Sequence, residues 1–220
     1  MANPLLLAVF IFALFLFLAF YFVSSALYKF RHKQKYHFYQ MFPYELNYPS
    51  VFKDNPYGNI LFILGCVAVS AFYILNPLDS IYRIMAIVAA IIFTALLVCL
   101  LLIPLYYLRT HMFLSVGIMV LPIALTMFNF FLAFNKYKIE TDQIQIALCI
   151  ISMVLSGIMA LTSVLLILNP KLTFKIYLEK ADDGSESLRR PKIIYLALTE
   201  WCSIFIFFLS PLAVLLINLI

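Results

Sequence analysis

The chain alternates between long stretches of apolar residues and short polar segments. Each of six apolar stretches is long enough, at about 1.5 Å per residue, to cross roughly 30 Å of hydrocarbon as a helix. They cover residues 5–27, 59–76, 81–108, 112–134, 144–168 and 193–219. The roughly ten-residue segments of alternating polarity that a transmembrane barrel requires do not occur. The pattern predicts an all-α, polytopic membrane protein in which residues 1–220 form a single membrane domain of about six transmembrane helices.

Composition supports the same class. Only 11% of the residues are charged, whereas a soluble globular domain has roughly 25%. The four cysteines, Cys66, Cys99, Cys149 and Cys202, fall in four different apolar stretches. They show neither the pairing of a disulfide framework nor the spacing of a zinc site. We therefore expect neither a metal nor another cofactor, and we expect the lipid bilayer, rather than nucleic acid, to surround the chain.

Basic residues are distributed unequally between the two sides that six crossings would create. One side holds Lys29, Arg31, Lys33, Lys35, Lys53, Arg109, Lys171, Lys175, Lys180, Arg189, Arg190 and Lys192, and the other holds Arg83, Lys136 and Lys138. Cytoplasmic loops of membrane proteins collect Lys and Arg. The sequence therefore predicts a multi-pass protein of the plasma membrane with both termini extracytoplasmic. The first stretch lacks a basic segment before it, and its length favours a retained span over a signal peptide.

Two cytoplasmic loops have a character of their own, residues 28–58 and 169–192. The first is basic at its start and then rich in Tyr, Phe and Pro, which suits either the headgroup region of a membrane or a docking surface for a partner protein. The second suggests a short β-hairpin that turns at Asp183 and Gly184, with disorder as the alternative. Anionic lipid headgroups are expected to bind the basic residues of both loops: Lys29, Arg31, Lys33, Lys35, Arg189 and Arg190.

Candidate chemistry is sparse, because the chain contains no zinc-binding HExxH, no phosphate-binding glycine loop and no GxSxG nucleophile motif. His32, His37 and His111 are expected to face solvent or headgroups on the cytoplasmic side. Inside the predicted spans, Asn129 and Thr126 suggest a hydrogen bond between helices or a contact with a ligand.

A series of small residues follows one face of the fifth predicted span. Ser152, Ser156 and Ala160 recur every four residues, with Gly157 beside them. Small side chains allow two helix backbones to approach closely. We expect this face to form a helix–helix contact, either within the chain or with a partner.

Glu200 and Trp201 lie within the last apolar stretch, where a carboxyl group is unexpected. The stretch is longer than one crossing requires, so the crossing itself can be assigned to the residues from Trp201 onward. Trp201 would then belong to an aromatic belt at the cytoplasmic interface, and Glu200 would reach headgroups, water or Arg109. A Glu200 enclosed by other helices would instead indicate a functional group.

Three functions are compatible with these features. The first is a non-catalytic membrane component, a subunit or scaffold of a larger transport or envelope assembly, that contacts a protein partner through its cytoplasmic loops. The second is a small-solute transporter or its substrate-binding component. It draws on a weak internal echo between residues 74–79 and 167–172, which could mark two inverted three-helix halves. The third is an intramembrane enzyme that uses Glu200.

Overall fold

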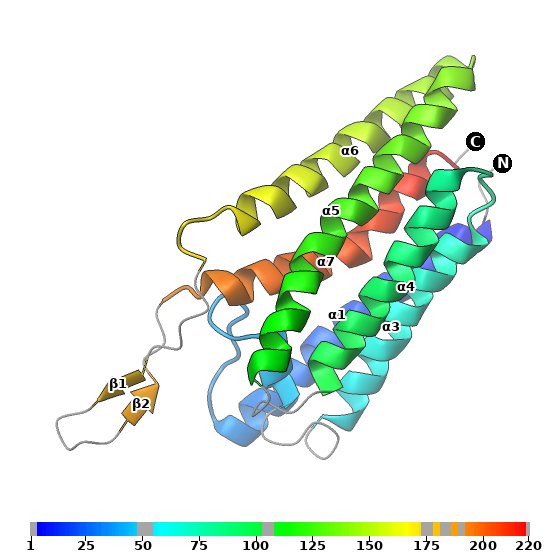
Figure 1. The fold of residues 1–220 in the computed structure, drawn as a ribbon. Helices are drawn as coiled ribbons and strands as arrows, with labels where there is room; N and C mark the ends of the chain where they lie inside the picture. The colour runs from blue at the N-terminus through cyan, green and yellow to red at the C-terminus, as the bar shows by residue number, and fades with distance from the viewer. Residues whose placement is uncertain are drawn as a thin grey trace.

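The chain folds as a bundle of helices in a computed structural model (Figure 1). The structure describes residues 4–47, 55–102, 108–172, 178–180, 186–188 and 192–218. The helices are α1 (Pro4–His32), α3 (Pro56–Leu75), α4 (Ile81–Leu102), α5 (Leu108–Ile139), α6 (Gln143–Ile167) and α7 (Tyr195–Leu216). A short 3-10 helix, η1 (Pro43–Asn47), and two strands, β1 (Leu178–Lys180) and β2 (Glu186–Leu188), complete the described elements.

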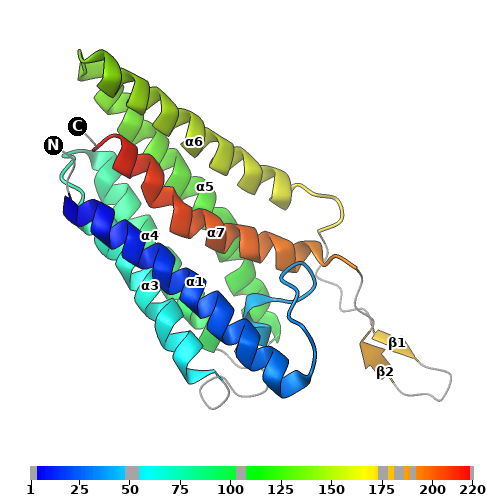
Figure 2. The ribbon, with the colours of Figure 1, turned by 180° about the vertical axis from the view of Figure 1, so that it is seen from behind.

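Within the residues that the structure describes, six helices are long and apolar enough to cross a membrane, so the predicted all-helical membrane class is confirmed. The chain is therefore described as an integral membrane protein. The predicted spans differ from the helices mainly around the third and fourth. There α4 ends at Leu102 and α5 continues to Ile139. Both described ends of the chain lie at the same end of the bundle (Figures 1 and 2), as expected for six crossings.

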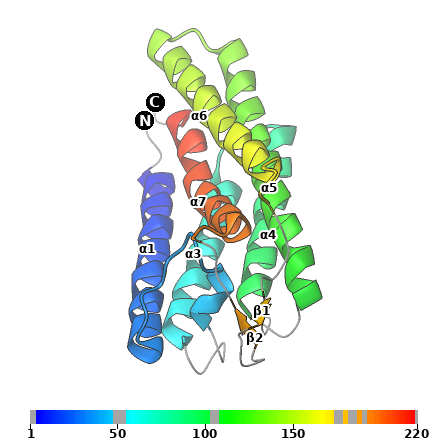
Figure 3. The ribbon, with the colours of Figure 1, turned by 90° about the vertical axis from the view of Figure 1, so that its left-hand side faces the viewer.

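The last helix, α7, occupies the centre of the bundle. It packs against α1, α3, α5 and α6, and Figure 3 shows it between α1 and α5. Three large side chains of α7, Trp201, Phe207 and Phe208, are completely buried. The Phe207 ring also lies 4.6 Å from that of Phe93 on α4. The apolar interior is therefore built around α7, and the surrounding helices present their outer faces to lipid.

Local sequence signals explain where several helices begin and end. Asn55 and Asp142 accept hydrogen bonds from the first backbone N–H groups of α3 and α6, as N-cap residues do. The two Asn-Pro sequences end α3 and α6, because the residue before a proline avoids helical backbone angles. At the same C-terminal end of α3, Arg83 donates to the carbonyl of Ile74 at 3.0 Å.

Two internal prolines are accommodated within the long helices. Pro211 of α7 has no N–H, so the carbonyl of Phe207 loses its usual helical donor. The Ser210 hydroxyl donates to that carbonyl at 2.9 Å instead. In α5, the Thr126 hydroxyl donates to the carbonyl of Pro122 at 2.6 Å. At Pro211, a side-chain hydroxyl thus satisfies a backbone carbonyl that lipid could not.

The C-terminal end of α7 is held by side chains from its neighbours. The carbonyl of Ile217 accepts hydrogen bonds from Gln145 at 2.8 Å and from Lys136. Ser152 donates to the carbonyl of Ala213 at 2.7 Å. A positive charge at a helix C-terminus is favourable, because the last carbonyls carry partial negative charge.

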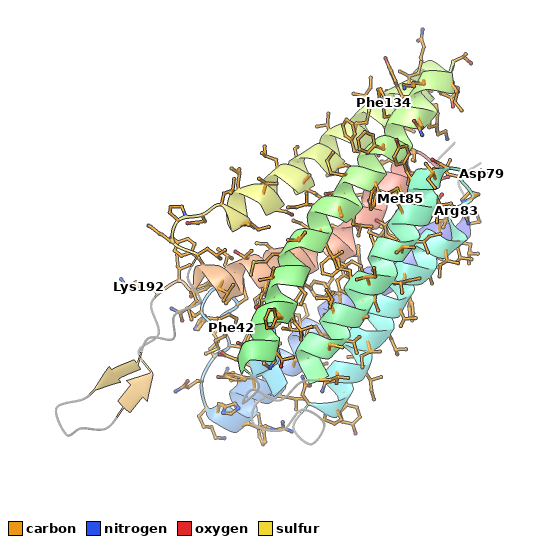
Figure 4. The ribbon with its side chains drawn as sticks, in the orientation of Figure 1. Phe42, Asp79, Arg83, Met85, Phe134 and Lys192 are labelled. Carbon is orange, nitrogen blue, oxygen red and sulfur yellow. The ribbon has the colours of Figure 1, made fainter. Side chains whose placement is uncertain are left out.

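The segment between α1 and η1 folds back against the start of α7. The backbone N–H of Ile194 donates to the carbonyl of Tyr39 at 2.9 Å, and Gln40 donates to the carbonyl of Lys192 at 2.8 Å. Figure 4 shows Lys192 and Phe42 toward this end of the bundle, opposite Asp79 and Arg83. The approach to α7, at Lys192 and Ile194, therefore packs against the segment between α1 and η1.

The two strands of the predicted hairpin are present. β1 pairs with β2 in antiparallel register, with Leu178 opposite Leu188 and Lys180 opposite Glu186. The predicted turn at Asp183 and Gly184 lies outside the described residues. Figures 1 and 2 show the hairpin apart from the helices.

Candidate functional site

The most concentrated group of buried polar side chains lies where α7, α5 and the segment 33–47 meet. Two neighbours on α7, Glu200 and Trp201, supply its centre, and both are completely buried. Successive residues of a helix are rotated by about 100°. The two side chains consequently reach different neighbours: Trp201 reaches the 33–47 segment, and Glu200 reaches α5.

Trp201 connects α7 to the aromatic segment through its single polar atom. Its indole Nε1 donates to the Tyr36 hydroxyl at 3.0 Å and lies 3.1 Å from the carbonyl of Met41. Its ring packs against Phe20 and Tyr21 of α1, at centroid distances of 6.5 and 5.7 Å. A buried Trp normally satisfies its N–H while its ring fills an apolar site, and both conditions hold.

Tyr36 continues this network. Its hydroxyl donates toward the carbonyls of Met41, at 3.1 Å, and Phe42, at 2.9 Å. Burial raises the pKa of the Tyr36 phenol well above its ordinary value, and the nearby negative charge of Glu45 adds to the increase. The hydrogen bond from Trp201 acts in the opposite direction but is the smaller effect. Tyr36 is consequently a neutral phenol that both accepts and donates.

Glu200 makes its contact on the other side of α7. One carboxyl oxygen is hydrogen-bonded to the hydroxyl of Ser115 on α5. The other oxygen, Oε2, has no hydrogen-bond partner among the described residues. The same Ser115 hydroxyl lies 2.9 Å from the carbonyl of His111, one turn earlier. The His111 ring packs against Tyr44 of η1, with centroids 4.3 Å apart.

These positions differ from two expectations, those for Glu200 and His111. Glu200 was expected to reach headgroups, water or Arg109; the side chain of Arg109 is not among those described, and protein covers Glu200 completely. Trp201 lies level with Phe20 of α1, and Lys29 is nine residues, or about 13 Å of helix, further toward the basic end of α1. Both side chains are therefore covered by protein rather than exposed at the surface. His111, expected to face solvent or headgroups, is 2% exposed, because η1 folds over it.

Asn129 lies in a second polar group, deeper in the bundle. Its amide nitrogen donates to the Tyr73 hydroxyl at 2.9 Å and to the carbonyl of Ser210 at 3.0 Å. The Tyr73 and Ser210 hydroxyls are themselves 2.8 Å apart. These bonds connect α3, α5 and α7. Thr126, by contrast, bonds to the backbone of its own helix.

The small-residue face of α6 is divided by the structure. Ser152, Ser156 and Ala160 are buried against the bundle. Gly157 is not, since a Cβ added to it would meet no atom within 4 Å. Among the described residues, therefore, Gly157 makes no close helix contact.

The basic residues are placed at the surface where the structure describes them. Lys29, Arg31, Lys33 and Lys35 have exposed side chains at the end of α1 and just beyond it. Arg189 and Arg190 lie outside the described residues. Among the described side chains, no group of three or more His, Cys, Asp or Glu could hold a metal ion.

Sequence reasoning missed Ser115, Tyr36 and Tyr73 as partners of the buried polar groups. Ser115 and Glu200 are 85 positions apart, and a single sequence carries no signal of such a pairing. The chain matches no known family model, no curated protein and no solved structure.

Proposed function

We propose that the chain is a non-catalytic component of a larger assembly in the plasma membrane, a subunit or scaffold that binds a partner protein at its cytoplasmic end. In this proposal both termini are extracytoplasmic. The segment 33–47, the hairpin and the basic residues then face the cytoplasm, and the basic residues also contact anionic lipid.

The observation that carries the proposal is the hairpin. β1 and β2 pair with each other and stand apart from the helices in Figures 1 and 2. A two-stranded hairpin alone is at best marginally stable in water and needs a further surface to pack on. A partner protein at the cytoplasmic end would supply that surface.

The buried polar groups give further support. Asn129, Tyr73 and Ser210 bond to one another across three helices, and Thr126 bonds to its own backbone. Polar groups that hold helices together are expected of a structural component. For transport of a small solute, these same side chains would have to be released to a ligand.

One observation favours a second candidate, an intramembrane enzyme. The carboxyl group of Glu200 has a hydroxyl, that of Ser115, within hydrogen-bond reach, as a general acid or base requires. Full cellular function with Glu200→Gln would exclude this candidate.

Affinity purification tests the partner. The tagged protein is crosslinked in its native membrane and solubilised in mild detergent, and the chains recovered with it are identified by mass spectrometry. A partner in stoichiometric amount supports the proposal. Recovery of the tagged chain alone, after crosslinking, contradicts it.

A matched pair of variants at the centre of β1 then tests the contact. Glu179→Pro breaks the strand, because proline cannot donate to the ladder and restricts the backbone, whereas Glu179→Ala leaves the pairing possible. The partner should be recovered with Glu179→Ala and lost with Glu179→Pro. Equal recovery with both would show that the partner does not depend on the hairpin.

A further inference from the structure

Glu200 is completely buried, and its burial is due to protein alone. Among the side chains that the structure describes, the elements around it carry the titratable groups His111 on α5, Tyr44 and Glu45 on η1, and Tyr36 on the segment 33–47. Within that described set there is no lysine or arginine; the side chain of Arg109 is not among those described. An isolated ionised carboxylate is among the most costly groups to bury.

The hydrogen bonds around Ser115 raise a question of proton supply. The Ser115 hydroxyl has one proton but contacts two oxygens, Glu200 Oε1 and the carbonyl oxygen of His111. A backbone carbonyl can only accept. If Ser115 donates to His111, the proton between Ser115 and Glu200 has to come from Glu200. A carboxyl group that carries a proton satisfies both contacts, and an ionised one satisfies only one of them.

We propose that Glu200 is a proton-binding site of this protein, with Ser115 as its positioning residue. The Glu200 carboxyl group holds the proton and donates it to Ser115 Oγ, and Ser115 donates to the carbonyl of His111. No bond other than these hydrogen bonds changes, and the ligand of the site is the proton itself. The proposal is independent of a partner protein.

The segment 33–47 covers the site on the side of the basic residues. Four described hydrogen bonds fasten the segment to α7 and its approach: Trp201 to Tyr36 and to Met41, Gln40 to Lys192, and Ile194 to Tyr39. Exchange of the Glu200 proton with water therefore requires this segment to move. Gln40 is the fastening side chain that lies outside the buried site and can be removed without disturbing Glu200.

Infrared spectroscopy of the whole protein in lipid bilayers at neutral pH tests the proton directly. The difference spectrum between the wild-type protein and Glu200→Gln should contain the C=O stretching band of a protonated carboxyl group. Glu45→Gln, a matched control on η1, should leave that band in place. Carboxylate stretching bands in the first difference spectrum, in place of the C=O band, would overturn the proposal.

Ser115→Ala keeps the assignment independent of whether Glu200→Gln folds. Loss of the hydrogen bond to Ser115 should move the same C=O band to higher frequency while Glu200 itself is retained. An unchanged band would remove Ser115 from the site.

In D₂O the band should shift slowly in the wild-type protein and at least several-fold faster in Gln40→Ala. Equal exchange rates would show that the 33–47 segment is not the cover.

Discussion

Trp201 of α7 donates a 3.0 Å hydrogen bond to the hydroxyl of Tyr36, a residue 165 positions earlier in the chain. Through this bond the central helix holds the segment 33–47, whose own backbone carbonyls accept from Tyr36. A segment rich in aromatic residues is thereby fixed under the bundle rather than left free in the headgroup region. The stability of this end of the molecule should depend on two polar atoms.

Removing the indole N–H tests this dependence. Trp201→Phe keeps an aromatic ring but leaves buried acceptors without their donor, which costs about 1–3 kcal/mol. We expect a lower Tm in detergent and faster hydrogen exchange in residues 36–42. Tyr21→Phe is the control, because the Tyr21 hydroxyl has no hydrogen bond in the described structure. Equal losses in both variants would mean that the hydrogen bond from Trp201 is not responsible.

The raised pKa of Tyr36 predicts a loss of stability at alkaline pH. In the unfolded chain a tyrosine ionises near pH 10, whereas burial and Glu45 keep the folded phenol neutral to higher pH. Its contribution is therefore complete below about pH 10 and falls as the pH rises above that value. In a series of Tm measurements, the difference between wild type and Tyr36→Phe should shrink from pH 9 to 11. A constant difference would contradict the linkage.

Ser210 replaces the N–H that Pro211 lacks, and a double-mutant cycle can measure this. Ser210→Ala leaves the carbonyl of Phe207 without a donor and should cost about 1–3 kcal/mol. Pro211→Ala restores the backbone N–H, so Ser210→Ala should cost less in that background. Urea or thermal unfolding in detergent provides the four values. A cost that is the same in both backgrounds would assign the loss to the Tyr73 contact instead.

The sequence predicted the class of fold well because its signals are local. Apolar length alone located the six helices, and the Asn-Pro sequences located two helix ends. The last apolar stretch, residues 193–219, is longer than one crossing requires, and the sequence predicted that the crossing begins at Trp201. The structure starts α7 at Tyr195, ends it at Leu216, and covers Trp201 with protein.

The candidate site could not be predicted in the same way. Glu200 stands out in the sequence, but its partner Ser115 is an ordinary hydroxyl residue at the start of another helix. The burial of Glu200 depends on how η1 and the 33–47 segment fold back. The prolines and aromatic residues of this segment indicate that it does not span the membrane. They do not indicate the helix against which it folds. Such contacts are tertiary, and no periodicity encodes them.

Two glycines that look alike in the sequence should respond oppositely to substitution. In Gly58→Ala the new Cβ would collide with the side chains of Ser24 and Asn55, which bond to each other at 2.8 Å. We expect a clear loss of stability, of about 1–3 kcal/mol. Gly157→Ala meets open space and should be neutral or stabilising by up to about 1 kcal/mol, because alanine favours helix.

Thermal unfolding of both glycine variants in the same detergent gives the comparison. A stable Gly58→Ala would mean that α1 and α3 approach less closely than the structure shows. A destabilised Gly157→Ala would indicate a partner helix against the free face of α6, since the chain itself leaves that position open.

The orientation that the basic residues predict can be measured with two single cysteines in a background without the four native ones. Lys33→Cys and Thr141→Cys both lie at exposed positions, one after α1 and one between α5 and α6. In the predicted topology one helix separates Lys33 from the N-terminus and four helices separate Thr141 from it. The two cysteines should therefore lie on opposite sides of the membrane. If cytoplasmic loops collect positive charge, a membrane-impermeant maleimide added to intact cells should label Thr141→Cys. Lys33→Cys should react only after the membrane is opened. The reverse pattern would place the hairpin and the 33–47 segment outside, and a cytoplasmic partner would then be excluded on geometry alone.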